Sequence, residues 1–153
     1  MPDLQPKDPD FEARVRASFT RQAAMESLGI TILRLQAGEI ELAMPYNAAF
    51  TQQHGFMHAG IITTALDSAC GYAAFSLMPA DAGVLTIEFK TNLLVPAKGE
   101  LFTFRGHVLK PGRTITVCEA QAFAHDGGSS KLVASMTATL MALLDRESVR
   151  NLT

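Results

Sequence analysis

The stretch that decides the fold is HAGIITTALDSACGYAAFSL, residues 58–77. It contains no proline and few polar residues, so it predicts a helix that is buried nearly all round. At 1.5 Å per residue, this helix would be roughly 30 Å long. A sheet wrapped around the helix is the simplest way to bury it. The surrounding backbone could approach closely at its small residues, which are Gly60, Ala65, Ala69, Gly71, Ala73 and Ala74.

The residues before this segment predict one cover helix and one pair of strands. Apolar side chains recur at helical spacing from Asp10 to Leu28, and Gly29 is a natural stop for a helix. Residues 30–35 and 39–44 are short strand-like runs joined by a Gln-Ala-Gly turn. We expect the helix to cover the core and to leave its three arginines in solvent, namely Arg14, Arg16 and Arg21.

Four strand-like segments follow the long helix. They span residues 84–95, 100–109, 114–124 and 131–144. In the first segment Leu85, Ile87 and Phe89 alternate with polar residues, which is the pattern of a strand with one apolar face toward the core. The Lys-Pro-Gly-Arg sequence at 110–113 joins the next two segments as a hairpin. The order of elements predicts an α+β domain with a mainly antiparallel sheet.

The composition fits one folded domain. The chain has 153 residues, of which 48% are hydrophobic and 18% charged, and this is enough to bury a core. We expect a single domain over residues 10–144, with flexible tails at 1–9 and 145–153. The net charge of −2 argues against a nucleic-acid partner, and no apolar stretch is long enough for a membrane span. The acidic, proline-containing start lacks a secretory signature, so we expect a cytoplasmic protein.

Asp67 is the most distinctive polar residue, because it lies in the middle of the apolar helix. Burying a carboxylate costs desolvation free energy unless the group is paired, hydrogen-bonded or reached by water. One interpretation is structural, with Asp67 facing solvent or bonding to the backbone of a strand. The other is catalytic, with Asp67 as a general base for water or as a nucleophile. The apolar surroundings favour the catalytic interpretation.

The histidines and cysteines give weaker indications of function than Asp67. His54 and His58 stand four apart, but Gly55 separates them and no third ligand is evident, so a zinc site is disfavoured. We expect His58 to open the long helix instead. Cys70 and Cys118 lie in apolar stretches, which favours two reduced core cysteines over a disulfide or a catalytic thiol.

The start of the long helix offers a second candidate, made of backbone. The first N–H groups of a helix have no intrahelical acceptor and lie at the positive end of the helix dipole. If the helix begins at His58-Ala59-Gly60, the N–H of Ala59 can bind an anion or an oxyanion that develops during a reaction. The small residues Ala59 and Gly60 also leave room for a ligand.

The residues from Gln52 to Asp67 resemble the motif of PaaI-like hot-dog-fold acyl-CoA thioesterases. That motif reads approximately Asn-x-x-Gly-x-x-His-Gly-Gly, with an Asp eight residues after the first glycine of His-Gly-Gly. The chain has Gln52-Gln53-His54-Gly55-Phe56-Met57-His58-Ala59-Gly60, followed by Asp67. The likeness spans roughly residues 30–143. It departs from the motif where Gln52 replaces asparagine and Ala59 replaces the first glycine.

The resemblance implies a hot-dog fold, in which an antiparallel sheet wraps one long central helix, and a role for each motif residue. Asp67 would be the general base or nucleophile, and the Ala59 N–H would polarise the thioester carbonyl. Gln52 would bind that carbonyl or position water. Thr86 would orient the hydrolytic water, and His58 would support the helix start. The substrate would also lie near Gly55, Phe56 and Gly60, with the CoA phosphates near Lys90, Lys110 and Arg113.

The resemblance also implies a reaction and an assembly. The reaction is hydrolysis of an acyl-CoA to an acid and CoA, without a metal or an organic cofactor. Two protomers would pair edge to edge, with active sites between subunits, and such dimers often pair again into tetramers. Two alternatives stay open, namely a non-catalytic acyl-CoA sensor with the same fold and an enoyl-CoA hydratase that uses His58.

Overall fold

A computed structural model of the chain describes residues 4–144. Its helices are α1 (Phe11–Arg21), α2 (Ala23–Leu28) and α3 (Ala59–Phe75), with a single 3-10 turn, η1 (Ala48–Phe50). Its strands are β1 (Thr31–Gln36), β2 (Glu39–Pro45), β3 (Gly83–Leu93), β4 (Leu101–Lys110), β5 (Ile115–Asp126) and β6 (Ser129–Leu143). No helix in this part of the chain is both long enough and apolar enough to cross a membrane.

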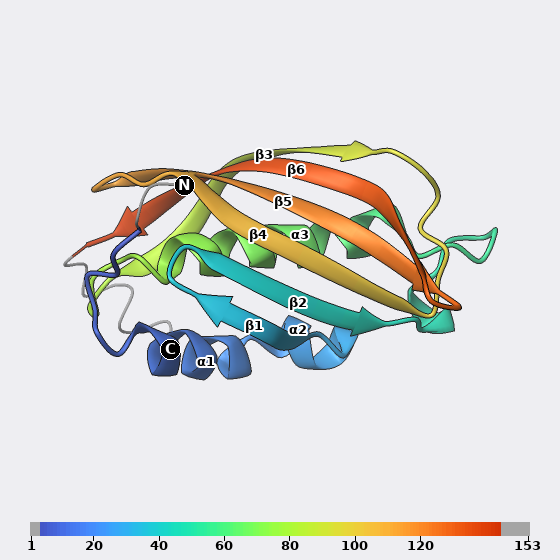
Figure 1. Cartoon of the computed structure of the whole chain (residues 1–153), viewed down its shortest axis with the longest axis horizontal. Coiled ribbons are helices and arrows are strands. Elements are labelled where there is room, and N and C mark those ends of the chain that lie inside the picture. The colour runs from blue at the N-terminus through green and yellow to red at the C-terminus, as the bar shows by residue number, and fades with distance from the viewer. Residues whose placement is uncertain (1–3, 145–153) are drawn as a thin grey trace.

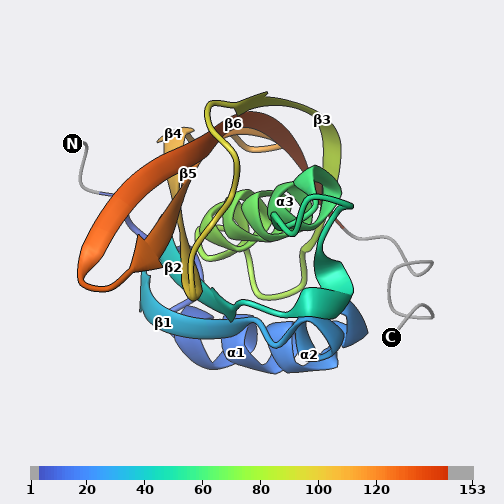
Figure 2. The ribbon, with the colours of Figure 1, turned by 90° about the vertical axis from the view of Figure 1, so that its right-hand side faces the viewer.

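The strands form one sheet in the order β1-β2-β4-β5-β6-β3, and every neighbouring pair is antiparallel. The sheet curves around α3, while α1 and α2 lie beyond β1 (Figures 1 and 2). The expected α+β hot-dog architecture, a sheet wrapped around one long helix, is therefore confirmed. The two edge strands of the sheet are β1 and β3.

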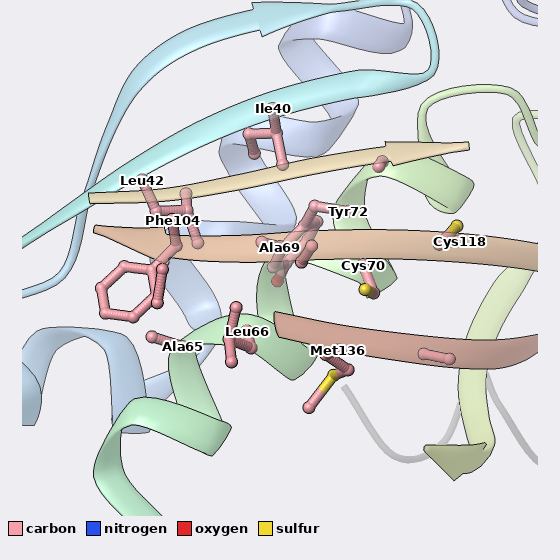
Figure 3. Packing of buried hydrophobic residues seen from close by; sticks show 14 of the residues in the cluster. Ile40, Leu42, Ala65, Leu66, Ala69, Cys70, Tyr72, Phe104, Cys118 and Met136 are labelled. Carbon is pink, nitrogen blue, oxygen red and sulfur yellow. The ribbon is translucent and has the colours of Figure 1, made fainter. Parts of the chain in front are cut away.

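Helix α3 is deeply buried because its residues are small and apolar. Ten of its 17 residues are buried, and Figure 3 shows several of them packed beneath the strands. Strand β4 approaches the helix so closely at Gly106 that an added Cβ atom would lie 2.5 Å from the carbonyl oxygen of Ala69. Before this contact the strand fills the core with the fully buried Phe102 and Phe104, and after it with the buried Val108. Small residues in α3 thus set the distance between helix and sheet.

The first helical segment is broken in two at Gln22, whereas one continuous helix was expected over residues 10–28. Gln22 is extended, with φ −80° and ψ 97°. On a straight helix with 3.6 residues per turn, Val15 and Leu28 would point about 140° apart. The break allows both side chains to be buried in the same core. Gly29 then ends the second piece with φ 69°, as expected for a left-handed cap.

Arg14 lies against the end of α3, although it was expected in solvent. Its Nε donates to the carboxylate of Asp8 over 2.7 Å, and Asp8 is buried. One of its terminal nitrogens donates to the carbonyl oxygens of Phe75 and Met78, over 3.2 and 2.8 Å. The guanidinium also lies 4.2 Å from the centroid of the Phe75 ring. The last carbonyl groups of a helix need donors from outside it, and Arg14 supplies one to Phe75, the last residue of α3.

The residues before α1 join the domain as well. Residues 4–9 were expected to be a flexible tail, but Leu4 packs against the hydrophobic core and Asp8 pairs with Arg14. The remaining parts of the two expected tails, 1–3 and 145–153, lie outside the described residues.

In the first half of strand β3, the side chains point to the opposite faces of the sheet from those expected. Leu85 and Ile87 were expected to face the core, but they are 53% and 51% exposed. The register between β3 and β6 shifts between Thr86 and Glu88, which makes Ile87 the extra residue of a bulge. Because successive residues of a strand point to opposite faces, the extra residue exchanges the faces of the residues before it. Thr86 therefore pairs with the buried Leu140 and faces the helix.

Candidate active site

Asp67 lies in the middle of α3 and is half-buried. Its Oδ1 accepts a 2.7 Å hydrogen bond from the hydroxyl group of Thr86. The bulge in β3 makes this contact possible, because it turns Thr86 toward the helix. Within residues 4–144, Oδ2 accepts no hydrogen bond, so this oxygen is free to take a proton.

Thr86 was expected to orient a water molecule, and that role remains a prediction. A hydroxyl group has one proton to donate and two lone pairs to accept with. Since Thr86 donates its proton to Asp67, it can accept a hydrogen bond from water but cannot donate one at the same time. In this geometry Thr86 orients the carboxylate directly.

A cavity of about 810 Å³ lies beside Asp67 and Thr86. Helices α1 and α3 and strand β3 line it with Ser18, Arg21, Gln22, Asp67, Ser68, Gly71, Tyr72, Val84, Leu85 and Thr86. Small-molecule sites commonly have volumes of roughly 300–1,000 Å³. The cavity is therefore large enough for a ligand to reach the free oxygen of Asp67.

Sequence analysis did not identify the residues of α1 that line this cavity, although the spacing of its polar residues could have indicated them. Arg14, Ser18 and Arg21 follow one another by four and three residues, which places them on one face of a helix. That face borders the apolar stripe, so it lies near the core rather than opposite it. Arg16, by contrast, is exposed as expected and pairs with Glu12.

Helix α3 begins with a side-chain cap. His58 is the N-cap residue, and its Nδ1 accepts a 2.9 Å hydrogen bond from the N–H of Gly60. The residue thus occupies the place expected for it at the helix start. Ala59 is the first helical residue, so alanine keeps the backbone helical at the position where the motif has glycine. Among residues 4–144, nothing accepts a hydrogen bond from the Ala59 N–H, which leaves a free donor at the positive end of α3.

Gln52 closes the loop in front of this helix. Its side-chain Oε1 accepts a hydrogen bond from the N–H of His54, and its backbone bonds to Phe56 and Gly55 over 2.9 and 3.0 Å. Gly55 has φ +83°, a conformation that favours glycine. Because Oε1 is used within the loop, the side-chain amide group of Gln52 keeps its N–H donors for another partner.

The helix start has its own cavity, of about 390 Å³. Its lining is mostly apolar and comprises Gln52, Phe56, Met57, Ala59, Ile62, Leu93, Leu94, Val95, Pro96, Ala97, Val133 and Ala134. The structure thus brings together three of the predicted site residues, Gln52, Phe56 and Ala59. The two glycines predicted beside them, Gly55 and Gly60, flank this cavity in sequence without lining it.

Within one chain, the Asp67 carboxylate lies too far from the Ala59 N–H for both to act on the same group. Ala59 and Asp67 line different cavities. They are separated by eight residues of α3, which is about 12 Å of helical rise. A single thioester group cannot contact both of them in one protomer.

The edge strand β3 carries an exposed apolar surface next to both cavities. Phe89, which was expected in the core, is 45% exposed because no strand covers this edge. The other exposed large apolar residues along this edge are Leu85, Ile87 and Leu93 in β3 and Leu94 just after it. An exposed, apolar edge strand is a site for pairing with another strand.

The three basic residues predicted to lie near CoA phosphates are exposed. Lys90 is on β3, Lys110 ends β4 and Arg113 lies in the turn that follows. None of them lines the cavity of Asp67 or the cavity of Ala59. If these residues contact CoA, they do so on the outer surface of the protein and not inside either cavity.

Both cysteines are free and buried, as expected. Burial raises the pKa of the Cys70 thiol and raises that of Cys118 to about 12. A thiol is nucleophilic only as its thiolate, so a catalytic Cys70 is disfavoured. No cluster of three or more His, Cys, Asp and Glu within residues 4–144 is arranged to hold a metal ion.

Sequence and structure comparisons relate the chain to thioesterases. Residues 54–131 match the sequence profile of the thioesterase superfamily. A protein of Saccharolobus solfataricus named as an esterase is 36% identical over 65% of this chain and 71% of its own. A thioesterase family protein from Silicibacter pomeroyi has a crystal structure with TM-score 0.86 and 59% identity, covering 87% of this chain and 98% of that one. The E. coli PaaI protein, from the phenylacetic acid degradation operon, shares the fold with TM-score 0.79 at 19% identity, over 88% of this chain and 94% of its own.

Proposed function

Because the chain belongs to the thioesterase superfamily and has the fold of PaaI, we propose that it is a cytoplasmic enzyme that hydrolyses acyl-CoA thioesters to a free acid and CoA. The observation that carries the proposal is the half-buried carboxylate of Asp67, which is held on one oxygen by Thr86, has no hydrogen bond on the other within residues 4–144, and lines a cavity of about 810 Å³. This arrangement suits a carboxylate that must react rather than one that only stabilises the fold.

In the proposed reaction, Asp67 is the general base. Its Oδ2 takes a proton from a water molecule while the water oxygen forms a bond to the thioester carbonyl carbon. The tetrahedral intermediate then collapses, the C–S bond breaks, and the CoA thiolate receives the proton from Asp67. Thr86 keeps the carboxylate oriented through Oδ1.

Direct attack by Asp67 is the other route, and it forms a mixed anhydride between enzyme and acyl group. A single turnover in ¹⁸O-labelled water tests for this route. Label in the Asp67 carboxylate would show an anhydride that water opens at the Asp67 carbon, whereas label in the acid alone fits general-base hydrolysis and also an anhydride opened at the acyl carbon.

The oxyanion donor in this proposal is the Ala59 N–H of a second copy of the chain. Antiparallel pairing of two β3 edges would extend the sheet and cover the exposed apolar residues. A two-fold axis reverses the direction of the second α3, so its N-terminal end would lie opposite the C-terminal half of the first. The carboxylate of one copy and the helix-start donor of the other would then face one substrate, and two such dimers can pair into a tetramer.

The two alternative functions fit the site less well. A protein that only binds acyl-CoA has no use for a half-buried carboxylate with a free oxygen, which costs desolvation free energy. A hydratase needs an acid or base aimed at the acyl α and β carbons. His58 uses its Nδ1 to cap α3, which ties its ring to the helix start. Analysis of the products from saturated and enoyl thioesters separates hydrolysis from hydration.

The test is CoA release from short, medium, long and aryl acyl-CoAs, followed with a thiol reagent. Both protein cysteines are buried, so the reagent reports the CoA thiol. We expect Asp67→Asn to lower kcat by about a hundredfold or more. Asp126→Asn, at the exposed last residue of β5, is the matched control and should behave as wild type. An Asp67→Asn variant that hydrolyses thioesters at the wild-type rate would refute the proposal.

A further inference from the structure

The α1 wall of the Asp67 cavity carries polar groups that the proposed reaction does not use. Ser18, Arg21 and Gln22 line this wall. The hydroxyl of Ser18 lies 3.3 Å from that of Tyr72, and the Tyr72 ring packs against Phe19 with centroids 5.5 Å apart. These contacts hold α1 against α3, so the position of the wall is defined by packing.

Arg21 is the arginine of α1 that has no protein partner. Arg14 pairs with Asp8, and Arg16 pairs with Glu12 over 2.9 Å. The side chain of Arg21 makes no hydrogen bond or ion pair with any other residue in 4–144, although its charge acts on the nearby Tyr72. It lines the same cavity as Asp67 without reaching the carboxylate within 4.0 Å. Its guanidinium is therefore available to a ligand in the cavity.

The chemistry of this wall selects for negative charge. A guanidinium presents a planar set of donors that matches a carboxylate or a phosphate. Burial raises the pKa of Tyr72, so the neighbouring hydroxyl stays neutral and does not offset the positive charge of Arg21. The cavity at the helix start has no charged residue in its lining. Arg21 is the cationic residue in the lining of the Asp67 cavity, where it can pair with an anionic part of the substrate.

We propose that Arg21 is a specificity-determining residue that binds an anionic group of the substrate, either a carboxylate at the far end of the acyl chain or a phosphate of CoA. The inference rests on the proposed function, because it takes the cavity of Asp67 as the substrate site. A terminal carboxylate would make thioesters of dicarboxylic acids the preferred substrates. A phosphate would instead fix the CoA portion and leave the acyl group unselected.

The test measures binding, which does not depend on catalysis by Asp67. The ligands are three thioether analogues that cannot be hydrolysed, namely S-(4-carboxybutyl)-CoA, S-pentyl-CoA and S-(4-carboxybutyl)-pantetheine. Isothermal titration gives the Kd of each for wild type, Arg21→Gln and the control Arg16→Gln. Both variants change an exposed arginine of α1, so neither should prevent folding.

We expect Arg21→Gln to raise the Kd of S-(4-carboxybutyl)-CoA about tenfold, the effect of losing one charge-assisted contact. If the acyl carboxylate is the ligand, the pantetheine analogue weakens equally and S-pentyl-CoA is unaffected. If a phosphate is the ligand, both CoA analogues weaken and the pantetheine analogue does not. The proposal is overturned if Arg21→Gln binds all three as wild type does, or if Arg16→Gln shows the same loss. Inactivity of wild type towards every acyl-CoA would instead count against the proposed function alone.

Discussion

Replacing Ala59 with proline would remove one hydrogen-bond donor and change little else. Proline is favoured at the first position of a helix, and Ala59 holds that position in α3. The residue before a proline prefers extended dihedrals, and His58 already has φ −59° and ψ 136°. The Ala59 N–H donates to nothing in residues 4–144, so no internal hydrogen bond is lost. We expect the free energy of unfolding of Ala59→Pro to stay within about 1 kcal/mol of wild type.

The same substitution should remove most of the activity. If the Ala59 N–H binds the developing oxyanion, its loss costs about 2.7–4 kcal/mol, or about 10²–10³ in kcat. The effect should fall on kcat more than on KM, because the oxyanion exists only in the transition state. Steady-state CoA release measures both constants, and thermal unfolding shows whether the variant is folded.

Two control variants keep the N–H at this position. Ala59→Gly restores the residue usual in the motif, and Ala59→Ser adds bulk to the side chain. Both should retain kcat close to that of wild type. A folded Ala59→Pro with wild-type kcat would refute the assignment of the oxyanion donor. A loss in Ala59→Ser as large as that in Ala59→Pro would show that crowding, rather than the missing donor, causes the effect.

Other perturbations test the carboxylate, the packing and the N-terminus. Thr86→Val should lower kcat about tenfold or more, because the Asp67 carboxylate loses the hydrogen bond from Thr86. Thr86→Ser keeps the hydroxyl group and should retain kcat close to that of wild type, and steady-state kinetics measures both variants. Gly106→Ala should lower the free energy of unfolding by about 1–3 kcal/mol, because the new Cβ would collide with the backbone of α3. Gly71→Ala has open space around its Cβ and should not lower it, and urea unfolding measures both variants. The hydrogen bond from its arginine partner holds the pKa of Asp8 below its usual 3.8, so that stabilisation is present above this pH and lost as pH falls through the lowered value. Urea titrations should therefore find Asp8→Asn more damaging at about pH 6 than at about pH 3, and equal losses would contradict the assignment.

The elements with strong local patterns could be predicted from the sequence. The helix expected at 58–77 is found at Ala59–Phe75, and the last strand expected at 131–144 is found at Ser129–Leu143. A long run with few polar residues is stable only where most of it is buried, so its structure follows largely from composition. The break at Gln22 and the bulge at Ile87 violate no local rule, and both arise from packing against parts of the chain that are distant in sequence.

The same division applies to the candidate site. Asp67 and Ala59 could be found because a carboxylate and a helix start are visible in one continuous stretch. The family resemblance named Thr86, but its direct contact with Asp67 depends on the bulge, which the alternating pattern of β3 does not reveal. Arg21 lies 46 residues before Asp67 in the chain, and only the packing of α1 against α3 places both in one cavity.

The bulge in β3 also bears on how the protein avoids uncontrolled self-association. A long, regular, apolar edge would be a template on which any extended chain could add as a further strand, and fibrous aggregates grow in this way. The extra residue at Ile87 interrupts the even ladder of donors and acceptors near the middle of this edge. A regular strand therefore cannot keep its hydrogen bonds in step along the whole edge. The residue that sets Thr86 against Asp67 thus also makes this edge a poorer template for unrelated extended chains.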